Sequence, residues 1–139
     1  MKTQLLFQEH LALGIQHVFD HVSKHLLTQM KRSETYLPNG SGLTQCLYRG
    51  PDNTSCAVGC LIANREYKVQ YENKSIDWLQ QQNKEFVIND GIILNLLGQL
   101  QCLHDSLEVE NWKESLKNLS TEFNLVWNQD LYPTDVKSV

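Results

Sequence analysis

Apolar residues recur at helical spacing near the start of the chain. Over residues 4–32 they form one stripe, made of Ile15, Val18, Phe19, Val22, Leu26 and Met30. A repeat of three and four residues places such positions on one face of a helix. Gly14 costs roughly 1 kcal/mol relative to alanine inside a helix, and it is a candidate break between an N-terminal turn and the main helix.

Two longer helices are predicted in the second half of the chain. Residues 91–106 carry a wide apolar arc, and Asp90 can cap their first turn. We therefore expect this helix at the centre of the core. Residues 109–124 carry a narrower apolar stripe, which consists of Trp112, Leu116, Leu119 and Phe123.

A short helix and a C-terminal tail complete the predicted helical part. Ser75 can cap a helix over residues 75–82. Residues 126–139 are predicted to be a tail that docks in part, through Trp127 and Tyr132, and frays beyond them.

Three connecting segments have mixed signals. Residues 33–42 contain proline, asparagine and two glycines close together, which predicts a loop. Residues 63–74 are polar with interleaved aromatic residues, a pattern compatible with a strand or with a short helix capped by Asn64. Residues 86–88 are predicted to be a short strand or an extended link.

A β-hairpin is predicted in the centre of the chain. Pro51, Asp52 and Asn53 are turn-forming residues. The segments on either side, residues 43–50 and 55–62, are short and apolar-rich, as hairpin strands often are. A small antiparallel hairpin or sheet packed against about four helices makes the predicted fold α+β.

The register of that hairpin determines which side chains share a face. In one register Cys46 faces Cys60 and Tyr48 faces Val58, and the shared face holds Cys46, Tyr48, Cys56, Val58 and Cys60. A slip of one residue would change the whole set. Residues 57–62 could instead begin a helix, because an apolar run this short is compatible with both structures.

The composition is that of an ordinary globular domain. The 139 residues are 41% hydrophobic and 20% charged, with a formal net charge of −4, so we expect one domain over residues 1–139. Without a dominant basic patch, duplex nucleic acid is not an expected partner. No apolar run reaches the roughly 20 residues of a membrane span, and polar residues 8–10 interrupt any signal-peptide pattern. We therefore expect a cytoplasmic protein that does not bind a membrane.

The four cysteines are predicted to be reduced, buried thiols, as is common in cytoplasmic proteins. Cys46, Cys56 and Cys60 could with a histidine form a zinc site, but they lack the paired spacing of zinc knuckles. A Cys46–Cys60 disulfide is a further alternative. A cysteine could also join His25 or His104, together with Asp105, in a catalytic triad. We expect the side chains of His104 and Asp105 to diverge, however, because they are sequence neighbours on a helix. No metal or cofactor is expected.

Histidines repeat along the first predicted helix. His17, His21 and His25 are four residues apart, a spacing that can chelate a metal on a helix surface. The favoured interpretation is a solvated polar face opposite the apolar stripe. His10 is expected in a frayed turn.

Tyr48 and Arg49 are the best binding candidates. Arginine offers a planar fork for phosphate, and tyrosine offers a stacking face. The alternative is a structural arginine that bonds loop carbonyls or Asp52. The predicted ligand-binding residues are Tyr48, Arg49, Asp52, Cys56, Arg65, Tyr67, His25 and His104.

The central stretch resembles a group of short phage and prophage-encoded accessory proteins. The shared positions are Cys46, Tyr48, Arg49, Gly50, Asp52, Cys56, Ala57, Val58 and Gly59. Asn53 stands where that group usually has glycine, and Ala63 and Asn64 stand where it often has proline and aspartate. The resemblance implies a phage-type origin, and it implies no particular chemistry.

The favoured function combines this origin with the binding candidates. We expect a non-catalytic protein that counters host antiviral defence by binding and sequestering a small nucleotide-derived signal in the host cytoplasm. A homo-oligomer is compatible with such a role, because pockets often form between subunits. The alternatives are an inhibitor of a host protein, acting through the surface of residues 67–78, and a small hydrolase that uses Cys56 or Cys60.

Overall fold

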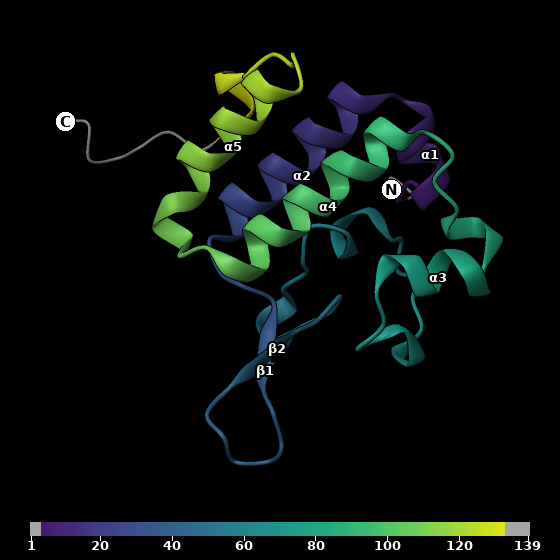
Figure 1. Cartoon of the computed structure of the whole chain (residues 1–139), viewed down its shortest axis with the longest axis vertical. Coiled ribbons are helices and arrows are strands. Elements are labelled where there is room, and N and C mark those ends of the chain that lie inside the picture. Colours follow the sequence, from purple (N-terminus) through teal and green to yellow (C-terminus); the bar gives the residue numbers. More distant parts are fainter. Residues whose placement is uncertain (1–3, 133–139) are drawn as a thin grey trace.

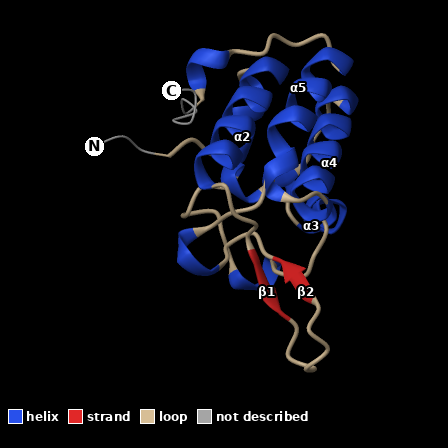
Figure 2. Ribbon diagram, turned by 90° about the vertical axis from the view of Figure 1, so that its left-hand side faces the viewer, coloured by secondary structure: helices blue, strands red, loops and turns tan. Residues whose placement is uncertain are grey.

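A computed structural model describes residues 4–132 of the chain (Figure 1). Its main helices are α2 (Ile15–Gln29), α4 (Gly91–Ser106) and α5 (Trp112–Glu122), which all contact one another. They lie together at one end of the molecule, and a two-stranded sheet projects from the other end (Figure 2). The predicted α+β fold is confirmed.

The first predicted helix is divided at the glycine. Helix α1 (Phe7–Ala12) ends before Gly14, whose φ of +102° is a conformation that glycine adopts readily, and α2 begins at the next residue. The chain therefore turns sharply, and α1 contacts α2. The apolar stripe of α2 is buried at Val18, Phe19, Val22 and Leu26.

Helices α4 (Gly91–Ser106) and α3 (Ile76–Gln82) begin where their caps predict. Both Ile92 and Ile93 donate their backbone N–H groups to Asp90 Oδ1, at 2.9 and 3.2 Å, and α4 spans the predicted range. Helix α3 is capped by Ser75. A 3₁₀ turn (Val109–Asn111) precedes α5, so the predicted helix over residues 109–124 is shorter as an α-helix.

The predicted pairing of residues 43–50 with residues 55–62 is wrong. Strand β2 (Thr44–Cys46) pairs instead with β1 (Glu34–Tyr36), in the antiparallel register Glu34 to Cys46 and Tyr36 to Thr44. Cys46 does not face Cys60, and Tyr48 does not pair with Val58. The loop predicted for residues 33–42 is thus partly strand.

The predicted turn at residues 51–53 is present, but the residues that follow it do not form a strand. Gly50 and Thr54 pair across it, and Asp52 and Asn53 have positive φ. Residues 55–62 then coil inward and include a 3₁₀ turn (Gly59–Leu61). Their apolar side chains are buried in the core, namely Cys56, Ala57, Val58, Leu61 and Ile62. A segment that is apolar on all sides gains more from full burial than from a half-exposed hairpin.

The ambiguous segments are mostly irregular. Residues 63–74 form turns and a 3₁₀ turn (Val69–Tyr71) rather than a strand or an α-helix. Beyond a 3₁₀ turn (Lys84–Phe86), Val87 and Ile88 form an extended link into α4. No helix in residues 4–132 has both the length and the apolar character to cross a membrane.

The C-terminal segment docks as far as it is described. The rings of Trp127 and Tyr132 stack with their centroids 4.4 Å apart, and Trp127 meets Phe19 of α2 edge-on. The expected fraying concerns residues 133–139, which lie outside the described residues.

Candidate functional site

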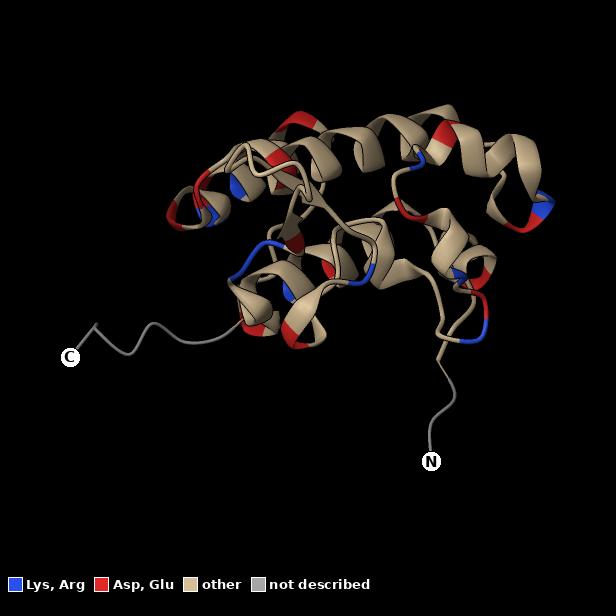
Figure 3. Cartoon of the chain, turned by 90° about the horizontal axis from the view of Figure 1, so that it is seen from below, with Lys and Arg blue, Asp and Glu red and all other residues tan. Residues whose placement is uncertain are grey.

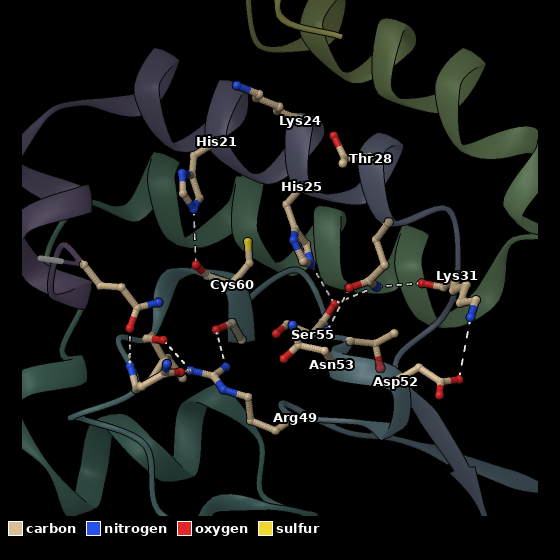
Figure 4. A pocket seen from close by; sticks show the side chains of 16 residues that line it. His21, Lys24, His25, Thr28, Lys31, Arg49, Asp52, Asn53, Ser55 and Cys60 are labelled. Carbon is tan, nitrogen blue, oxygen red and sulfur yellow. Dashed lines mark hydrogen bonds and ion pairs between the residues drawn. The ribbon is translucent and has the colours of Figure 1, made fainter. Parts of the chain in front are cut away.

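A hollow of about 800 Å³ lies between α2 and residues 49–64 (Figure 4). We call it the α2 groove. Its charged lining residues are Lys24, Lys31, Arg49 and Asp52, so three cations face one carboxylate. Elsewhere acidic and basic positions are interspersed along the chain (Figure 3). The α2 groove therefore differs in charge from the molecule as a whole, whose formal net charge is −4.

Three side chains of α2 hold the opposite wall of the groove. His21 Nε2 lies 3.2 Å from the carbonyl oxygen of Cys60, and His25 Nε2 lies 2.9 Å from that of Ser55. Gln29 bonds both the N–H and the carbonyl of Ser55. The interpretation of the histidine face as solvated is therefore wrong, because its spacing of four residues matches the path of residues 55–60 (Figure 4).

These contacts determine the chemical state of the two histidines. A ring nitrogen that faces a carbonyl oxygen must carry the proton, so Nε2 is the donor in both rings. Burial lowers the pKa of His21 and of His25, and the carbonyl contact only partly opposes this effect. Both imidazoles are therefore neutral near pH 7, and the positive charge of the groove comes from its lysines and arginine.

Arg49 braces the backbone of the groove. Its guanidinium donates to the carbonyl oxygens of Gly59 at 2.7 Å and Ile62 at 2.5 Å, and more weakly to Tyr48 and Asn64. These bonds use four of the five N–H donors of the side chain. Arg49 therefore matches the alternative interpretation, in which the arginine is structural and bonds loop carbonyls. It contributes charge to the groove, but its fork is not free for a phosphate.

Glu72 holds the backbone at Tyr48 and Arg49 in place. Its carboxylate accepts the backbone N–H groups of Tyr48 and Arg49, at 2.9 and 3.0 Å, and the hydroxyl of Tyr67 at 2.6 Å. Burial, together with this carboxylate, raises the pKa of Tyr67 to about 12. Sequence reasoning missed Glu72, because one acid in a polar stretch carries no signal that it will bind a distant loop.

The eight predicted binding residues do not form one site. Of these, His25, Arg49 and Asp52 line the α2 groove, while Tyr48 and Cys56 line a second hollow of about 600 Å³. Tyr48 is directed away from the groove because its hydroxyl donates to the carbonyl of Lys74.

The other three lie outside both hollows. Tyr67 lies under the Arg49 guanidinium, with its ring centroid 5.0 Å from Cζ. Arg65 is exposed, and His104 is fully buried.

His104 and Asp105 contact each other directly, so the expectation that their side chains diverge is wrong. His104 Nδ1 lies 2.7 Å from Asp105 Oδ1, and its Nε2 accepts the backbone N–H of Ser33 at 2.9 Å. The short carboxylate reaches the ring because Nδ1 is the ring nitrogen nearer to the backbone. With both ring nitrogens engaged, His104 has no lone pair with which to deprotonate a thiol.

The cysteines are free thiols, and burial makes Cys46 and Cys56 favour the protonated form. All four are unpaired, so the alternative Cys46–Cys60 disulfide is not formed. Burial, and then Asp105, raises the pKa of Cys46 to about 12, and burial raises that of Cys56 to about 12 as well. A thiol in this state is a poor nucleophile at neutral pH.

Comparisons with known proteins contribute no further information. No protein-family model matches the chain, and neither a curated protein nor a solved structure matches it significantly. A function must therefore be inferred from geometry and charge. The α2 groove has the size of a small-molecule site, and it is the candidate that we develop.

Proposed function

We propose that this protein is a non-catalytic binding protein that holds a small, anionic, nucleotide-derived ligand in the α2 groove. The observation that carries this proposal is the charge of the lining, in which three cations face one carboxylate. Asp52 is itself paired with Lys31, at 3.6 Å between Oδ2 and Nζ. A negatively charged ligand would therefore meet a net positive wall.

The groove offers donors of the kind that phosphate groups require. Lys24 and Lys31 are exposed point charges, and Thr28 and Asn53 add neutral polar groups to the lining. Since Nε2 of His25 is engaged, its Nδ1 can accept a hydrogen bond from a base or a sugar hydroxyl. The groove is also braced by Arg49 and Gln29, which favours a preformed site over one that must be ordered on binding.

The chemistry favours capture over turnover. The buried thiols favour the protonated form, and His104 has both ring nitrogens engaged. In the setting implied by the resemblance to phage proteins, capture would remove a host signal from its receptor and so counter antiviral defence. A ligand sequestered in this way is released chemically unchanged.

The test begins with native mass spectrometry of the protein purified from cells that are mounting an antiphage response. Denaturing release is expected to yield a nucleotide whose mass matches the free compound. Thermal-shift assays and calorimetry with mono-, di- and cyclic nucleotides would then rank the ligands. The double substitution Lys24→Gln with Lys31→Gln should weaken binding by about 10-fold or more, since two charge-assisted contacts are lost.

A matched control separates charge in the groove from overall charge. Lys113→Gln removes a lysine of α5 that does not line the groove, and it should leave affinity unchanged. A ligand-free mass, with no thermal shift across the whole panel, would contradict capture and direct the search to a protein partner. Release of a hydrolysed nucleotide would show that the protein is an enzyme instead.

A further inference from the structure

We propose that His10, His17 and His21 form a binding site for a divalent transition-metal ion of the zinc type, between α1 and α2. One nitrogen from each ring can be chosen so that all three lie within 4.8 Å of one another. The ring centroids are 4.4 to 5.8 Å apart. This proposal does not depend on the function proposed for the α2 groove.

The fold builds this cluster by bending the chain. His17 and His21 are one helical turn apart, so they lie on the same face of α2. His10 comes from α1, and the bend at Gly14, whose φ is positive, places α1 against α2. Only 4% of His10 is exposed. A single straight helix over residues 4–32 would have left His10 almost two turns away from His17.

The spacing of the nitrogens is close to that of a metal site. His10 Nδ1 lies 2.9 Å from His17 Nε2, whereas nitrogens bound to zinc at tetrahedral angles are about 3.3 Å apart. A shift of a few tenths of an ångström would therefore admit an ion. Two neutral rings can both direct lone pairs at it if His10 carries its proton on Nε2 and His17 carries its proton on Nδ1.

His21 already has the outer contact that metal-binding histidines usually make. Its Nε2–H donates to the carbonyl oxygen of Cys60, which holds the ring in place and leaves Nδ1 with a free lone pair. Burial and the two neighbouring histidines also lower the pKa of His10 to about 4, so the ring stays neutral and competent to bind.

The ligand type selects the ion. Three imidazole nitrogens suit zinc, cobalt, nickel and copper, whereas magnesium and calcium prefer oxygen ligands. Three protein ligands leave a fourth tetrahedral position for water or for a group from a bound molecule. Since His21 also lines the α2 groove, the ion would lie beside that groove.

The experiment is a metal titration of the full-length protein. The purified chain is stripped with a chelator, dialysed against zinc chloride and analysed by plasma mass spectrometry, and affinity is measured by calorimetry. We expect one zinc per chain, no response to magnesium, and a thermal shift on adding zinc. His17→Ala should weaken zinc binding by more than the roughly 10–100-fold that the loss of an outer contact costs.

Two controls make the result specific. His25→Ala removes the next histidine of the same helix face, which is outside the cluster, and it should retain zinc. Within residues 4–132, Cys46, His104 and Asp105 are a second set of donors that lie close together. Cys46→Ser tests that set, and it should also retain zinc. Circular dichroism confirms that each variant is folded, and His17 is the preferred substitution because it is less buried than His10.

Cobalt provides a direct readout of the ligands. Substitution with cobalt should give a visible spectrum without the thiolate charge-transfer band that cysteine ligation produces. The proposal is overturned if zinc is not retained, if His17→Ala binds it as tightly as the unsubstituted chain, or if the thiolate band is present.

Discussion

At the scale of single residues, His25 and His104 stabilise the fold through hydrogen bonds. His25 donates to the carbonyl of Ser55, and His104 both accepts from Ser33 and donates to Asp105. A neutral imidazole is suited to this role because it offers one donor and one acceptor in a rigid plane. The contacts with Ser55 and Ser33 each join a helix to a loop distant in sequence, so these two rings stabilise the fold.

His10 provides the clearest pH prediction at this scale. Burial is the main cause that lowers its pKa from 6.5 to about 4; His21 and His17 of α2 add to the effect, and Glu9 of its own helix opposes it. Between these two pH values the unfolded chain binds a proton that the folded chain does not bind. The stability contribution is therefore complete above pH 6.5 and is lost as the pH falls toward 4, by on the order of 3 kcal/mol.

Urea unfolding of the metal-free protein at several pH values between 6.5 and 4 measures this contribution. His10→Gln keeps a polar side chain but cannot titrate, so its free energy of unfolding should depend less steeply on pH across the same range. Equal slopes for the two proteins would contradict the assignment to His10.

At the scale of elements, residues 55–62 are the segment on which the site depends. Gly59 lies against the backbone of Tyr48, and a Cβ built on it would be 2.5 Å from the Tyr48 carbonyl oxygen. The same stretch is held by Arg49 and by the side chains of α2. This packing explains why residues 55–62 coil against the core instead of extending.

Gly59→Ala should therefore destabilise the protein by roughly 2–3 kcal/mol, because the added methyl group would collide with backbone atoms that cannot move freely. Gly98→Ala is the matched control. Gly98 lies within α4 and has open space where its Cβ would be, so alanine should stabilise the helix by roughly 0.5–1 kcal/mol. Chemical denaturation of both variants tests the contrast, and the same sign of change in both would count against this account.

The sequence predicted those elements whose signals are local. The caps at Ser75 and Asp90, the apolar stripes and the break at Gly14 each act within a few residues. The prediction that residues 43–50 pair with residues 55–62 was wrong because the strand that pairs with β2 is β1. Strand β1 is only three residues long and has no apolar alternation, so the sequence does not reveal it. Residues 55–62 offered a stronger strand pattern, but that pattern arises from burial on all sides.

The candidate site was predictable only in part, for a similar reason. Tyr48 and Arg49 are adjacent in sequence, yet they line different hollows. Lys24 and Lys31 line the α2 groove, but in the sequence they resemble any other solvent-facing lysines. The cluster of His10, His17 and His21 exists because the chain bends at Gly14, and the periodicity of one continuous helix does not show this proximity.

At the scale of the whole molecule, the segment after α5 packs back on α2, near the start of the chain. Gln16 of α2 bonds both the N–H and the carbonyl of Val126, at 2.9 and 3.0 Å, across 110 positions in sequence. Next to these hydrogen bonds, the Trp127 ring packs edge-on against Phe19 and stacks on Tyr132. The C-terminal segment therefore shields the outer side of α2, the helix whose other side carries the groove.

We expect Trp127→Ala to lower the free energy of unfolding by roughly 2 kcal/mol and Tm by several degrees, since a partly buried indole and its ring contacts are lost. Val126→Ala is the control, because that side chain is 67% exposed and its backbone bonds to Gln16 remain. Its effect should stay within about 0.5 kcal/mol. Thermal and urea unfolding of both variants measure the difference. Equal stability of the two would mean that the segment after α5 contributes little to the core, and that α2 holds the groove without support from the C-terminal side.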